Sequence, residues 1–77
     1  MKLYIEAKSR KEVNEKLKKG ELVMGVEYNR RNENYETIHN LRDCKGGMPV
    51  MFFLMMNDGE PIPRAYGTWN KEKNKIV

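Results

Sequence analysis

Two segments near the N-terminus alternate apolar and polar residues with a period of two, as a strand with one buried face does. The first is MKLYIEA, which predicts a strand over residues 2–7. The second is ELVMGVEYN, residues 21–29, and its predicted buried face consists of Leu22, Met24, Val26 and Tyr28. These segments predict two strands, each with one side toward a core.

Between them, SRKEVNEKLKKG carries the start and stop signals of a helix over residues 10–19. Ser9 is the expected N-cap, and Glu12 completes a capping box in which each side chain accepts from the other residue's free backbone N–H. A glycine follows as the C-terminal stop. Because only Val13 and Leu17 are strongly apolar, we expect the helix to pack one narrow face on a sheet.

The most apolar stretch is MPVMFFLMMN, residues 48–57, which has hydrophobic side chains at both alternating positions. This pattern predicts a central strand that is covered on both faces. One face would carry Val50, Phe52, Leu54 and Met56, and the other Met51, Phe53 and Met55. The run is far shorter than the roughly 20 residues of a membrane-spanning helix, so no membrane partner is expected.

The other segments predict turns and shorter strands. YETIHNL allows a short strand, DCKGG a loop, and the Asn57-Asp58-Gly59 sequence a hairpin turn. RAYGTW, residues 64–69, predicts an edge strand, and KIV adds a few paired residues. Together the elements predict a single α+β domain over residues 1–77, with one helix packed on a small, twisted, mainly antiparallel sheet of about four to five strands in β-α-β-β-β-β order.

Composition narrows the classes of function. The 77 residues carry a net charge of +4, with 34% charged and 39% hydrophobic residues, which is typical of a chain that folds. Basic residues are spread along the chain. Residues 1–29 hold seven basic and five acidic groups, and residues 30–47 and 48–77 each hold four basic and three acidic groups. The single cysteine, Cys44, allows no internal disulfide, so the expected location is the cytoplasm.

Few residues offer catalytic chemistry. Cys44 and the single histidine, His39, lie five positions apart, which makes a Cys/His pair conceivable, but the alternative of a half-exposed strand histidine and a small buried cysteine is favoured. A zinc site needs about four Cys or His ligands, which the chain lacks. No carboxylate dyad or phosphate loop is present. The expectation is therefore a protein that is not an enzyme and uses no metal or cofactor.

Two binding functions remain. A protein partner would contact aromatic, arginine and methionine side chains, the types suited to interfaces, and the candidates are Met51, Phe53, Met55, Arg64, Tyr66 and Trp69. The second face of the central strand needs a cover, which is either the Tyr66–Trp69 segment, a partner protein or a second copy in a homodimer. The alternative is nucleic-acid binding through Lys11, Lys18, Lys19, Arg30 and Arg31, although a solvated basic face is the simpler interpretation.

Two stretches carry a resemblance to a known class. AYGTWN, preceded by the NDGEPIPR turn, and the opening YIEAKSRKEVNEKLKKGE resemble small uncharacterised proteins encoded by tailed bacteriophages. The resemblance implies an accessory phage product that acts in the host cytoplasm. Many members of this class bind a host enzyme of defence or transcription and inhibit or redirect it by occluding its surface.

Overall fold

The computed structural model describes residues 2–29, 31, 34–54 and 61–77, which form one helix and six strands. The elements are β1 (Leu3–Glu6), α1 (Arg10–Lys18), β2 (Met24–Asn29), β3 (Asn34–Asn40), the short 3-10 helix η1 (Leu41–Asp43), β4 (Pro49–Phe53), β5 (Ala65–Asn70) and β6 (Lys75–Ile76). The predicted α+β class is confirmed. The sheet has one strand more than expected, because the two-residue β6 pairs with β5.

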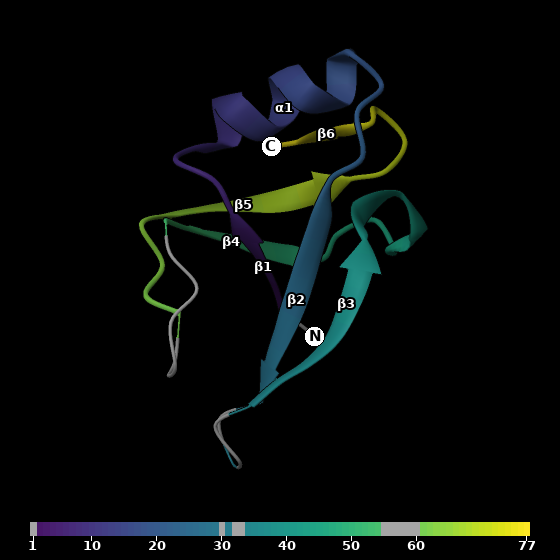
Figure 1. The fold of residues 1–77 in the computed structure, drawn as a ribbon. Coiled ribbons are helices and arrows are strands. Elements are labelled where there is room, and N and C mark those ends of the chain that lie inside the picture. Colours follow the sequence, from purple (N-terminus) through teal and green to yellow (C-terminus); the bar gives the residue numbers. More distant parts are fainter. Residues whose placement is uncertain (1, 30, 32–33, 55–60) are drawn as a thin grey trace.

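The six strands form one sheet in the order β3-β2-β1-β4-β5-β6 (Figure 1). Only β1 and β4 run parallel, with Leu3 beside Val50 and Ile5 beside Phe52, and every other neighbouring pair is antiparallel. The predicted central position of β4 is confirmed. The prediction that RAYGTW forms an edge was wrong, since β6 lies outside it.

Helix α1 begins and ends close to the predicted signals. Ser9 Oγ accepts from the Glu12 N–H at 3.3 Å, but the Glu12 carboxylate accepts from the Lys8 N–H at 2.8 Å, one residue before the expected partner. At the other end, Gly20 adopts a φ of +79°. The Gly20 and Glu21 N–H groups bond back to carbonyls of the last turn, as in a Schellman motif. Within the described residues, no helix is long and apolar enough to cross a membrane.

The main core lies between α1 and one face of the sheet. Val13 and Leu17 are buried there, as predicted, and Trp69 is the largest of the fully buried side chains. The Trp69 indole donates a 3.1 Å hydrogen bond to the Cys44 carbonyl, which ties the loop after η1 to β5. The cluster is completed by Leu3, Ile5, Ala7, Val23, Leu41, Cys44, Met48, Val50, Phe52 and Ile76.

A second cluster occupies the opposite face of the sheet and consists of Tyr4, Val26, Met51 and Phe53. The Tyr4 ring meets the rings of Tyr28 and Phe53 edge to face, with centroids 6.5 Å apart in each pair. The central strand is thus buried on both sides over residues 50–53, as its pattern predicted, but it ends at Phe53 and Leu54 is exposed.

The face predicted for residues 21–29 was partly wrong. Leu22 and Met24 are exposed, whereas Val23 and Gly25 are buried on the helix side. The physical reason is that Val23, just before β2, belongs to the helix-side cluster while Val26 of β2 belongs to the second one, so the segment buries side chains on both faces of the sheet.

The Asn14 side chain joins α1 to β6 near the C-terminus by two hydrogen bonds. Its side-chain nitrogen donates to the Ile76 carbonyl at 2.9 Å, and its side-chain oxygen accepts from the Ile76 N–H at 2.7 Å, across 62 residues of sequence. The side-chain amide thus bonds to β6 as a neighbouring strand would. It pairs the Ile76 backbone groups that face away from β5 on the outer edge of the sheet. Figure 1 shows α1 lying along β6.

Substituting Gly25 with alanine tests the close approach of β2 to β1. The new Cβ would lie 2.5 Å from Cγ of Leu3, which is fully buried and has no room to move. We expect a loss of about 1–3 kcal/mol in the free energy of unfolding, as for other overpacked cores, measured by urea denaturation. Gly46→Ala is the control, because its Cβ would meet nothing closer than 3.5 Å. Equal stability of the two variants would contradict this packing.

Substituting Asn14 with alanine tests the attachment of β6. The change removes both hydrogen bonds to Ile76, and we expect unfolding to become easier by about 1–3 kcal/mol. The Ile76 amide should also exchange its hydrogen faster. Glu15→Ala, at an exposed neighbouring position of α1, should leave that exchange rate unchanged. Unaltered protection of Ile76 in Asn14→Ala would show that the side chain does not hold the strand.

Candidate binding face of the sheet

The face of the sheet opposite α1 carries an apolar row that crosses five strands. In register, Ile38 of β3 lies opposite Val26 of β2, Val26 opposite Tyr4 of β1, Tyr4 beside Met51 of β4, and Met51 opposite Tyr66 of β5. Residues paired in this way project from the same face of a sheet. We call these five residues the cross-strand row.

Exposure changes along the cross-strand row. Its three central side chains are buried, while the two ends, Ile38 and Tyr66, are 66% and 65% exposed. Met24, two residues before Val26 on the same strand and therefore on the same face, is also exposed. The only helix of the described residues longer than one turn packs on the other face. The row therefore presents apolar groups to solvent at both ends of a closely packed centre.

The residues predicted to contact a protein divide into surface and core. Arg64 and Tyr66 are exposed. Just before β5, the Arg64 N–H donates a 2.7 Å hydrogen bond to the Phe52 carbonyl of β4. Trp69, only 1% exposed, lies in the helix-side core and does not cover the second face.

Met51 and Phe53 are buried in the second cluster within the single chain, so they support the surface from below and are not themselves accessible. Burial thus corrects the predicted contact role of Trp69, Met51 and Phe53. Met55 lies outside the described residues.

The residues predicted to contact nucleic acid are not brought together. Lys11, Lys18 and Lys19 are exposed on or next to α1, and Arg31 is exposed in the β2–β3 turn, where its N–H bonds to Asn29. In Figure 1 the end of β2 and the start of β3, which flank Arg31, lie at the end of the molecule opposite α1. Arg30 lies outside the described residues.

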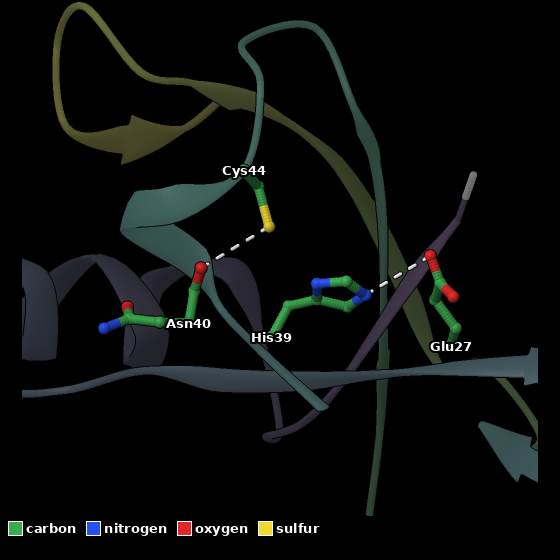
Figure 2. A network of polar contacts seen from close by, with 4 residues as sticks. All are labelled: Glu27, His39, Asn40 and Cys44. Atoms are coloured by element: carbon green, nitrogen blue, oxygen red, sulfur yellow. Dashed lines mark hydrogen bonds and ion pairs between the residues drawn. The ribbon is translucent and has the colours of Figure 1, made fainter. Parts of the chain in front are cut away.

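His39 and Cys44 direct their side chains to different partners (Figure 2). His39 Nε2 lies 3.3 Å from Glu27 Oε1, an ion-pair distance when the imidazole is protonated, and has no hydrogen bond among the described residues. The Cys44 thiol, 4% exposed, instead donates to the Asn40 carbonyl at 3.5 Å. The arrangement does not place the imidazole as a base for the thiol.

The electrostatic surroundings also keep the Cys44 thiol protonated. Burial raises its pKa, and the neighbouring Asp43 carboxylate raises the pKa further. Lys71 acts in the opposite direction, and Glu27 adds a smaller increase. Reactive cysteines have lowered pKa values, so this thiol has the character of a core side chain.

A shallow depression of about 480 Å³ opens beside Cys44. It is lined by His39, Asp43, Cys44, Lys45, Gly46, Gly47, Met48 and Pro49. Among the described residues, no group of three or more His, Cys, Asp or Glu side chains is placed to hold a metal ion. Besides the His39 imidazole and the buried Cys44 thiol, the depression offers one carboxylate and one ammonium group.

No protein-family model, curated protein or solved structure matches this chain. The resemblance to bacteriophage proteins therefore stays a prediction, and the case for a function depends on the surface itself.

Sequence reasoning missed Ile38, Val26 and Tyr4 as parts of one row, because they come from three separate strands. The only signal was an apolar residue in each strand, and strand register is needed to align them.

Alkylation of Cys44 tests its burial. At pH 8 we expect iodoacetamide to modify the folded protein at least about tenfold more slowly than the urea-unfolded chain, because access and thiolate formation are both restricted. The measurement is the rate of mass increase. Equal rates in the two states would mean that the thiol is accessible and ionised in the fold.

Proposed function

We propose that this protein is a non-enzymatic binding module that holds a protein partner on the face of its sheet opposite α1 and acts by occluding the partner's surface. The observation that supports this most directly is the cross-strand row, whose centre is buried in the second cluster and whose ends are exposed. A fixed apolar surface needs little ordering when a partner binds, which favours affinity.

The side chains at the ends of the row suit a protein partner. Tyr66 offers a large ring with a hydroxyl, and Ile38 and Met24 offer aliphatic surface of a kind that is usually covered when it is contiguous. Arg64 is exposed just before β5, two residues before Tyr66, and it is a residue type enriched at interfaces. Arg64 would supply a charged rim next to the apolar contact.

The partner class follows from the resemblance to phage proteins. On that basis we propose an accessory product of a tailed bacteriophage that binds a host macromolecule, such as a defence or transcription enzyme, in the host cytoplasm.

Affinity capture from host lysate, with the full chain immobilised, tests the role of the row. We expect the wild type to retain a host protein, and Ile38→Ser combined with Tyr66→Ser to reduce the retained amount at least about tenfold, since truncating a hot-spot residue costs about 2 kcal/mol or more. Quantitative mass spectrometry measures the difference.

Ile62→Ser combined with Leu54→Ser is the matched control, because both side chains are exposed and apolar but lie outside the row. This control should retain the host protein fully. Equal retention by the row variant, or a wild-type dimer in light scattering that the row variant dissociates, would overturn the proposal. The second result would assign the row to self-association.

A further inference from the structure

The helix α1 and the turn before β6 lie together although they are distant in sequence. The two hydrogen bonds between Asn14 and Ile76 hold α1 along β6. The turn itself is ordered, because Asn70 Oδ1 accepts from the Lys73 N–H at 2.9 Å and the Lys71 carbonyl accepts from the Asn74 N–H at 3.2 Å. Basic groups on the two elements therefore have fixed relative positions.

On α1, the neighbours of Asn14 on the side toward β6 are basic. Arg10 and Lys18 are four residues before and after Asn14, and Lys11 is three before, so all three share its flank of the helix. All three are exposed. Glu12 falls on the opposite flank of the helix, whereas the exposed Glu15, four residues after Lys11 and three before Lys18, borders this side.

The turn and β6 add three more exposed cations, which are Lys71, Lys73 and Lys75. Lys75 projects from the side of β6 opposite the buried Ile76. Within the described residues, no ion pair ties any of these six basic side chains to a carboxylate. We call these six residues, Arg10, Lys11, Lys18, Lys71, Lys73 and Lys75, the α1–β6 basic face.

The two segments that carry this face account for the net charge of the whole protein. Residues 8–21 and 71–75 together hold nine basic and four acidic residues, whereas the rest of the chain holds six basic and seven acidic ones. The net charge of +4 therefore arises at this end of the molecule. Counted along the sequence the charge is even, and only the fold brings the two basic segments together.

We infer that the α1–β6 basic face binds the phosphate backbone of nucleic acid without reading its sequence. Several cations that reach phosphates together release condensed counterions, which is the main source of non-specific affinity. The exposed residues of α1 and of the turn are all polar or charged. An acidic protein partner would require an apolar centre as well, which this face lacks. The inference is independent of the protein-binding row on β1 to β5.

Fluorescence anisotropy with a short labelled DNA duplex, titrated over a range of salt concentrations, tests the inference. We expect binding at low salt with equal affinity for two unrelated sequences, and a logarithm of the binding constant that falls linearly with the logarithm of the salt concentration. Two triple variants remove the face: Arg10→Gln, Lys11→Gln, Lys18→Gln, and Lys71→Gln, Lys73→Gln, Lys75→Gln. Each should lower the affinity at least about tenfold and reduce the salt slope by about 2–3.

The matched control removes the same charge elsewhere, with Lys2→Gln, Arg31→Gln and Arg42→Gln, which are all exposed. It should change the affinity by less than about threefold, the residual effect of net charge. Circular dichroism of each variant verifies folding. Absence of duplex binding by the wild type, an equal loss in the control, or displacement of the duplex by polyglutamate as effective as that by unlabelled DNA would overturn the inference. The last result would indicate a general polyanion site.

Discussion

The parallel pairing of β1 with β4 is the contact on which the rest of the fold depends. These two strands occupy the middle of the sheet, and their alternate residues supply both clusters, with Leu3, Ile5, Val50 and Phe52 toward α1 and Tyr4, Met51 and Phe53 toward the opposite face. A chain of 77 residues has little apolar surface to bury, so using both faces of the central strands extends its core. The remaining strands are positioned by pairing outward from this centre.

The two proposed surfaces are consequences of how the sheet ends on each side. On one face, strand register aligns apolar side chains from the buried centre to both sides of the sheet, and the outermost two, Ile38 and Tyr66, are exposed to solvent. At the β6 edge, Asn14 binds the backbone of the last strand and thereby aligns two basic segments. The surfaces share no residue, so the protein has room for a protein partner and a nucleic acid at once.

Local signals in the sequence were sufficient to predict the helix and the central strand. The capping residue Ser9, the glycine stop at Gly20 and the narrow apolar stripe of Val13 and Leu17 predicted α1 closely, because helix ends are determined by hydrogen bonds within a few residues. The two-sided apolar run likewise predicted the central strand. Residues 21–29 were harder, since Val23 is buried in one cluster and Val26 in the other, so a single buried face does not describe the segment.

The sequence by itself determined the class of fold, the helix, the position of the central strand and the scarcity of catalytic groups, because each depends on short-range pattern or on composition. Only the tertiary structure decided that Trp69 is core, that Ile38 and Tyr66 end one apolar row, and that Lys73 and Lys75 belong with Lys11 and Lys18. The physical reason is that strand register and the docking of Asn14 on Ile76 join residues distant in the chain, and neither leaves a local signal.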